Sequence, residues 1–477
     1  MKKPSAFRVF REKYAGDIRF WIFFFFILRM VGITDPPLEI AHNWRQVTGH
    51  MVARNFYETD NNILYPRLDI AGEKSGITGT EFSVLNYLEY LLSLIFGFHD
   101  WFGRLINLIV SSFGIFYFYK LLRLHFSERF SFNAAFVLLV SSWFMFSRKA
   151  MPDTFSTSLI IISVYFAYRY CSEKKLSQAL LYFFFSLCAV MSKIPAIYLL
   201  VVLAFPFLDR QVALRSKVVI TLLTLLMLIP VYWWYFRWVP QLNEQFGFKH
   251  YFMGVSFSTG LSEILHHPSP TVEKFYFDAL KFSGFLAFCA GLVLAIYKKE
   301  RRILWPALLC SLAFAVFMLK SGRNFYHHSY YIVPFIPVMA LFAGFALDHI
   351  QRPVVRTMML LLITAECIGN HQNDFYIKKS EKYKMGMEAI ADSFSKRKDL
   401  FLVNSTDNPQ QMYLLHRRGW LASPETLGRA GFIDSIAGLG CRYLLINRHE
   451  GKAPSIDKFE GKEVYNDDNF VVYSLQH

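Results

Sequence analysis

The chain is poor in charge and in cysteine. Only 18% of its 477 residues are charged, and its six cysteines show no paired spacing: Cys171, Cys188, Cys289, Cys310, Cys367 and Cys441. This pattern indicates neither a disulfide framework nor a thiolate metal site. The few charges lie between long apolar runs, which excludes an ordinary soluble globular protein.

Three further patterns are missing. AGEKSG at 71–76 lacks the G-x-x-x-x-G-K-[ST] spacing and the preceding strand of a phosphate loop. The basic N-terminus is followed by an apolar run without a small-residue cleavage site, which favours a retained first span. The repeated, Gly/Pro-broken helices with mid-span charge that are typical of transporters are also not evident.

The chain is rich in long apolar runs. Hydrophobic residues make up 54% and aromatic residues 18% of the sequence. A span needs roughly 20 apolar residues, and this criterion predicts a polytopic α-helical membrane protein with about 11–13 transmembrane helices. The candidate spans are 18–33, 102–122, 131–147, 154–170, 176–191, 194–208, 217–236, 277–297, 302–319, 329–347 and 354–370.

Basic residues predict the topology. The net charge of +15 comes from short clusters between the spans, where they face lipid headgroups, so no nucleic-acid partner is expected. With a cytoplasmic N-terminus, the clusters near 120–129, 171–175, 209–217, 297–302 and 348–356 all lie inside, as the positive-inside rule requires. If the apolar stretch 81–97 were a span, these basic clusters would lie on the external side. We therefore predict that 81–97 is an interfacial helix. The predicted external parts are 34–101, 147–154, Lys193, 237–276, 320–329 and everything after 370.

The first external segment, TDPPLEIAHNWRQVTGHMVARNFYE, predicts an amphipathic helix. Thr34 or Asp35 before two prolines is a helix-start signal. At helical spacing, one face carries the apolar residues Ile40, Trp44, Val47 and Met51, and the opposite face carries Glu39, His42, Gln46 and His50. We expect Gln46 and His50 to be solvated.

Residues after 370 have the composition of a soluble α/β domain. KDLFLVNST, CRYLLINR and NFVVYSLQ predict strands, and PQQMYLLHRRGW and GFIDSIAGLG predict helices. The expected organisation is a transmembrane domain, 1–370, with the external loop 34–101, followed by an external domain, 371–477. This second domain carries no catalytic constellation, and we expect it to bind an acceptor or to cover the cavity.

Several segments together resemble one family. WRQ, ARNFYE, NILYPRLD, a glycine-rich loop ending in Glu-Phe, WFGRLINL and SRKAMPDT are similar to bacterial relatives of the protein O-mannosyltransferase and aminoarabinose transferase clan. The resemblance covers residues 1 to about 200 and returns at HHSYYIVPFIP. It implies the GT-C architecture and a sugar taken from a polyprenyl-phosphate carrier.

The resemblance also implies candidate catalytic carboxylates. Asp153 matches the acid of a second external loop, and it lies in a short charged break between two apolar runs. Where many clan members carry an Asp-Glu pair, this chain reads WRQ, so the first-loop acid is chosen by position. Glu39 is the first choice and Glu81 the second, although Glu81 equally suits a helix N-terminus. Helix capping sufficiently explains Asp35.

Basic and aromatic residues are the candidate substrate contacts. Lys193, Arg148 and Lys149 are cations suited to a leaving phosphate, although a lysine snorkelling to headgroups would look the same. An aromatic belt equally explains the tyrosines near 330. The candidate binding residues are His42, Arg45, Arg148, Lys149, Lys193, His327, His328, Tyr330 and Tyr331.

The predicted function is that of an integral membrane glycosyltransferase. Its donor is a polyprenyl-phosphate-linked sugar, hexosyl or pentosyl, and its acceptor is a hydroxyl or amine of a glycan, lipid or protein on the periplasmic face of the inner membrane. Transfer is expected to invert the anomeric configuration, with a loop carboxylate as base. No cofactor is certain, and a divalent metal stays open. The alternative is a non-catalytic transporter or flippase of lipid-linked glycans.

Overall fold

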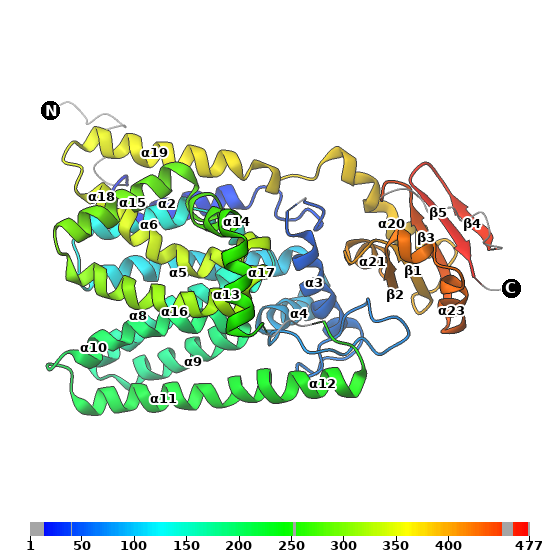
Figure 1. Ribbon diagram of the computed structural model, residues 1–477, viewed down its shortest axis with the longest axis horizontal. Coiled ribbons are helices and arrows are strands. Elements are labelled where there is room, and N and C mark those ends of the chain that lie inside the picture. The colour runs from blue at the N-terminus through cyan, green and yellow to red at the C-terminus, as the bar shows by residue number, and fades with distance from the viewer. Residues whose placement is uncertain (1–13, 40, 251–253, 451–460, 476–477) are drawn as a thin grey trace. The chain divides into compact units, whose positions relative to one another are not determined.

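The computed structural model describes residues 14–39, 41–250, 254–450 and 461–475 (Figure 1). The chain divides into two compact units. The first comprises residues 1–33, 103–234 and 252–372, and the second comprises residues 34–102, 235–251 and 373–477. Segment 34–102, expected as a loop of the membrane domain, thus clusters with the C-terminal residues.

The first unit is helical, and each of the eleven predicted spans overlaps a helix, although 18–33 and 131–147 also include non-helical residues. α2, α5 and α6 are Ile18–Arg29, Trp101–Arg123 and Glu128–Val140. The single turn α7, Trp143–Phe146, precedes α8, Pro152–Glu173, and α9, Leu176–Ser192. The remaining helices are η1 Ile194–Leu203, α10 Ala204–Leu208, α11 Leu214–Trp233, α13 Phe257–His266, α14 Pro268–Glu273, η3 Lys274–Ala279, α15 Lys281–Tyr297, α16 Arg301–Ser321, α17 Arg323–His327, η4 Ser329–Phe335, α18 Ile336–Asp348 and α19 Pro353–Asn370.

Several helices are membrane spans by length and composition. Within the described residues five helices are long and apolar enough to cross a membrane, or six if the pair 268–279 and 281–297, bent by 97°, is one span. The predicted fold class, a multi-pass α-helical membrane protein, is confirmed, but this criterion does not reproduce a count of 11–13. Several expected spans are short or broken: α2 has 12 residues, and the 17-residue α9 is followed by a 3₁₀ segment.

α18 and α8 form the interior of this unit. α18 packs against α6 and α15, and α8 packs against α9. A Cβ at Gly344 of α18 would meet the backbone of Ala134 in α6 at 2.6 Å, so only glycine permits this close approach. All residues from Ser141 to Met151 are buried, which places the charged break between α7 and α8 inside the protein.

The second unit contains a five-stranded sheet in the order β2-β1-β3-β5-β4. The strands are β1 Leu400–Asn404, β2 Arg418–Ala422, β3 Cys441–Asn447, β4 Lys462–Asn466 and β5 Phe470–Ser474. β1 pairs in parallel with β2 and β3, whereas β5 pairs antiparallel with β3 and β4. The predicted small α/β domain and three of its strands are confirmed. The predicted helix PQQMYLLHRRGW is too long, because α21 spans only Gln410–Leu415 and RGW belongs to β2.

The rest of this unit consists of helices and loops. Its other helices are α3 Asn43–Glu58, α4 Val84–Phe96, α12 Val239–Phe246, α20 Met387–Asp392, α22 Pro424–Leu427 and α23 Phe432–Gly438. The π-helix η2 Trp234–Trp238 and the 3₁₀ helices η5 Gln372–Asp374 and η6 Lys379–Gly386 lie at or within the bounds of this unit. α4, predicted to be interfacial, has 13 residues, fewer than the roughly 20 that a span requires.

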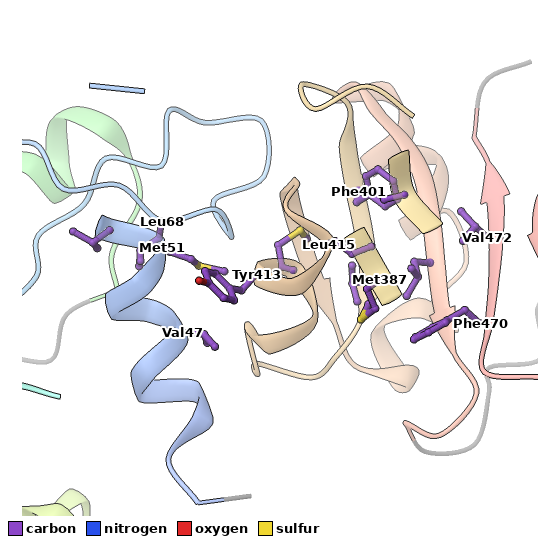
Figure 2. Packing of buried hydrophobic residues seen from close by; sticks show 14 of the residues in the cluster. Val47, Met51, Leu68, Met387, Phe401, Tyr413, Leu415, Phe470 and Val472 are labelled. Carbon is purple, nitrogen blue, oxygen red and sulfur yellow. The ribbon is translucent and has the colours of Figure 1, made fainter. Parts of the chain in front are cut away.

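One hydrophobic core joins α3 to the C-terminal sheet. Val47 and Met51 of α3 belong to the same buried cluster as Tyr413 of α21 and Phe401 of β1. Figure 2 shows Tyr413 directed from α21 towards Met51. Two segments more than 300 positions apart therefore stabilise each other.

This packing corrects the predicted helix in 34–58. α3 begins at Asn43, and its N-cap His42 has a left-handed backbone (φ 66°), so neither Asp35 nor the prolines start it. Gln46 and His50, expected to be solvated, are fully buried, whereas Trp44 is 38% exposed. On the face that sequence periodicity assigns to water, His50 is covered by Glu89 of α4 and by Tyr413 of α21, and Gln46 is bound to Glu39. The expected stripe residue Ile40 lies outside the described residues.

Candidate functional site

The structure places Asp153 in the first turn of α8. Met151 is the N-cap residue and Pro152 is the first helical residue, where its missing N–H costs no hydrogen bond. The positive end of the helix dipole favours a carboxylate at this position. Local sequence, Met-Pro-Asp after a buried turn, therefore fixes where the carboxylate lies.

Asp153 and Lys193 form a buried ion pair. Lys193, the residue that ends α9, donates from Nζ to Asp153 Oδ1 at 2.5 Å. Asp153 is 1% exposed and Lys193 8% exposed. Asp153 Oδ2 is also buried and has no hydrogen-bond partner in the described part of the chain. The carboxylate thus has one neutralised oxygen and one with unused acceptor capacity.

Aromatic rings surround the Lys193 ammonium. Nζ lies 5.0 Å from the ring centre of Tyr330 and 5.6 Å from that of Tyr331. His328 stacks on both tyrosines, with ring centres 5.1 and 5.6 Å apart. These contacts are of cation–π and stacking type. The structure therefore brings together Asp153, Lys193, Tyr330, Tyr331 and His328.

Other predicted residues of this unit lie differently. Arg148 donates from Nε to Arg29 O at 3.1 Å and from Nη2 to Val31 O at 2.5 Å, so it caps the carbonyls at the end of α2. Lys149 is 1% exposed. His327 is exposed and its described ring contact is with Tyr326, at 4.8 Å. Burial of Lys193 against Asp153 makes snorkelling to headgroups an inadequate account of that lysine.

Adjacent residues of α3 hold the first-loop carboxylates. Gln46 Nε2 donates to Glu39 Oε1 at 2.6 Å, and Arg45 forms an ion pair with Glu81. Glu39 is 5% exposed and precedes α3 instead of lying one turn inside a helix. The candidate carboxylates therefore divide between the units, with Glu39 and Glu81 in the second and Asp153 in the first.

His250 lies near the Arg45–Glu81 pair. Burial of the imidazole, reinforced by the positive charge of Arg45, lowers the pKa of His250 to about 4, although Glu81 acts in the opposite direction. This histidine is therefore neutral at physiological pH. No sequence pattern indicates this histidine, because it follows α12, far from the first loop.

Two more polar residues went unrecognised in the sequence. Glu89 accepts a hydrogen bond from His50 Nδ1, or donates one to it, at 2.7 Å, and both side chains are fully buried. A charge inside the apolar α4 is the signal that indicates such a pair. Asn107 of α5 donates a hydrogen bond to Lys149 O in the break before α8. Within the described ranges, no three His, Cys, Asp or Glu residues group as a metal site would require.

Comparisons with known proteins agree on the architecture. Residues 83–234 match the family model described as dolichyl-phosphate-mannose-protein mannosyltransferase. No curated protein matches the sequence. The structure of ArnT from Cupriavidus metallidurans bound to undecaprenyl phosphate is similar at a TM-score of 0.61 and 14% identity, over 95% of this chain and 98% of that one.

A second solved structure is the oligosaccharyltransferase of Archaeoglobus fulgidus in its apo form. It is similar at a TM-score of 0.56 and 13% identity, over 98% of this chain and 75% of that one. At 13–14% identity, the similarity to these two structures shows the fold alone. The resemblance inferred from the sequence is thereby confirmed at this level: the chain has the fold of the GT-C membrane glycosyltransferases.

Proposed function

We propose that this protein transfers a sugar from a polyprenyl-phosphate carrier to an acceptor hydroxyl or amine. The observation that carries the proposal is the buried Asp153–Lys193 pair at the start of α8 in a GT-C fold. An isolated buried charge pair is a poor way to gain stability, because desolvation offsets the Coulomb attraction. A pair with one unused carboxylate oxygen suits a site that handles protons and charge.

Asp153 is assigned to the acceptor. Its Oδ2 has unused acceptor capacity and can accept the hydrogen of an attacking hydroxyl or amine. Oδ1 remains on Lys193, which holds the carboxylate in one orientation. Glu39 and Glu81 remain candidates for orienting the acceptor.

Lys193 is assigned to the donor phosphate. Positive charge beside the departing phosphate stabilises the charge that develops there. Tyr330, Tyr331 and His328 form the wall behind it and are candidates for sugar contact. We assign Arg148 to holding the end of α2, which leaves Lys149 as the second cation candidate.

The site is proposed to face the periplasmic side of the inner membrane, because basic-loop parity places 147–154 and Lys193 externally. Individual side-chain contacts, and not the fold, select the sugar, whether hexosyl or pentosyl, and the acceptor. A glycan, lipid or protein acceptor is compatible with the chemistry.

The test compares lipid-linked sugars and surface glycans by mass spectrometry in cells with the protein, without it, and with Asp153→Asn. We expect a sugar modification that is lost without the protein and in the variant, while the variant reaches the membrane at normal levels. The matched control is Asp209→Asn, which changes an exposed carboxylate near α10. Full modification with Asp153→Asn, together with lipid-linked glycan on the wrong leaflet in the deletion, would favour a flippase.

A further inference from the structure

The break between α7 and α8 is a buried segment of irregular backbone. Residues 147–151 are buried and not helical, and Pro152 offers no N–H to the carbonyls before it. Buried carbonyl groups must find donors, most of all within a membrane protein. Within the segment the Lys149 N–H donates to Phe146 O and the Met151 N–H donates to Lys149 O. A carbonyl oxygen can accept a second hydrogen bond, so a polar side chain from another helix can hold this segment further in one conformation.

Asn107, fully buried in the second turn of α5, supplies such a donor. Its amide nitrogen lies 2.7 Å from Lys149 O, 3.2 Å from Phe146 O and 3.2 Å from Met151 O. Carbonyl oxygens only accept hydrogen bonds, so the amide nitrogen must face them and the side-chain orientation is fixed. The amide oxygen accepts from Ser111 Oγ at 2.9 Å on the same helix.

The contacts of Asn107 lie on both sides of Asp153 in sequence. Besides Met151 O, the Asn107 amide nitrogen lies 3.0 Å from Thr154 Oγ1, and its oxygen lies 3.1 Å from the same hydroxyl. One amide thus binds the residue two positions before Asp153 and the residue directly after it.

We propose that Asn107 is a positioning residue for Asp153: it holds the first turn of α8 so that the carboxylate keeps its place against Lys193. This inference rests on the proposed function of Asp153. A displacement of about 1 Å at a reacting group can cost about 100-fold in rate. Asn107 therefore affects the chemical step without touching substrate.

The first experiment measures kcat and KM of purified Asn107→Ala in detergent micelles, with the lipid-linked donor and the acceptor identified by the mass spectrometry above. We expect kcat to fall by about 10- to 100-fold with both KM values within twofold of wild type. Asn133→Ala is the matched control, because Asn133 of α6 is equally buried and its amide nitrogen has no hydrogen-bond partner among the described residues. A thermal midpoint lowered without loss of kcat per folded molecule would reduce Asn107 to a structural residue and overturn the inference.

The second experiment asks whether Asn107 acts through Asp153. In an Asp153→Asn background, Asn107→Ala should cost less than twofold further, because the group that it positions is already gone. If the rate losses of the two single variants multiplied in the double variant, the inference would be contradicted. Thr154→Val removes the hydroxyl contacts with Asn107 and with Phe146 O and leaves the other Asn107 contacts in place, so it tests the same idea if Asn107→Ala fails to fold.

The third experiment does not depend on turnover. Hydrogen exchange of residues 147–154 should be at least tenfold faster in Asn107→Ala than in wild type or Asn133→Ala. Unchanged exchange would overturn the inference whether or not the enzyme is active. Faster exchange in a protein whose wild type transfers no sugar would support the role of Asn107 in the segment and contradict the proposed function instead.

Discussion

Asp153 and Lys193, forty positions apart, share a hydrogen bond of 2.5 Å inside the helical unit. The pair joins the first turn of α8 to the end of α9. The two charges lie where water is excluded, so each depends on the other. This dependence makes the pair testable through stability as well as through activity.

The first prediction concerns stability. Lys193→Met leaves the Asp153 carboxylate buried without its ionic partner and should lower the free energy of unfolding by about 3–5 kcal/mol. The double variant Asp153→Asn/Lys193→Met removes both charges and should regain most of that loss. Thermal midpoints in detergent micelles measure both effects. An equally unstable double variant would show that Lys193 stabilises the protein mainly through its packing on the tyrosine rings.

The second prediction concerns the substrates. Per folded molecule, Lys193→Met should raise the KM of the lipid-linked donor at least tenfold and that of the acceptor less than threefold, because the ammonium acts on the phosphate. Lys175→Met, at an exposed lysine before α9, is the matched control. Equal changes in the two KM values would contradict a role at the donor phosphate.

How much of this site follows from sequence can be argued residue by residue. Asp153 and Lys193 were found because a charge interrupting an apolar run is costly and therefore noticeable. Their pairing was not predictable, because it depends on how α8 and α9 pack. Asn107 was missed because an uncharged amide barely disturbs an apolar run.

In the first external loop, the sequence predicted a helix but not all of its packing. Its helix was expected, and Val47 and Met51 are buried as predicted, but its start was wrong and Gln46 and His50 are buried as well. Glu39 binds Gln46, and Glu89 of α4 and Tyr413, more than 300 residues away, contact His50. Periodicity assigns one face to water only when no other domain covers it. The order of the helices, in contrast, follows from the long apolar runs alone, and so each predicted span overlaps a helix.

The third prediction is a pH dependence. The pKa of His250 falls from 6.5 to about 4 on folding, so between these values the unfolded chain binds more protons than the folded one. The stability of the second unit should therefore fall as the pH decreases from 6.5 towards 4. His250→Gln should flatten this part of the profile, whereas His449→Gln, at an exposed histidine, should leave it unchanged. Unfolding by denaturant, followed at several pH values, gives the comparison, and an unaltered slope in His250→Gln would refute it.

The fourth prediction is the topology. Reporters fused after residue 100 and after residue 370 should both report the external side, as the positive-inside rule requires. A third fusion after Lys299, between α15 and α16, should report the cytoplasm and controls for expression. A cytoplasmic signal after residue 100 with an external signal after residue 299 would mean that α4 crosses the membrane.

The last prediction is the stereochemistry of transfer. We expect a single displacement, in which Asp153 accepts the acceptor proton through Oδ2 and the acceptor attacks the anomeric carbon from the face opposite the phosphate. One carboxylate oxygen is held by Lys193 and the other has no partner in the described structure, which suits a base better than a nucleophile that must release its cation. Removing such a base should cost about 10² to 10⁴ in rate. NMR of the product should show the anomeric configuration inverted relative to the donor, and mass spectrometry of the quenched enzyme should find no sugar on Asp153. A retained configuration with a trapped glycosyl-enzyme would instead mean that Asp153 attacks the anomeric carbon through Oδ2, and the uncharged ester so formed would leave Lys193 without its anionic partner until water hydrolyses it.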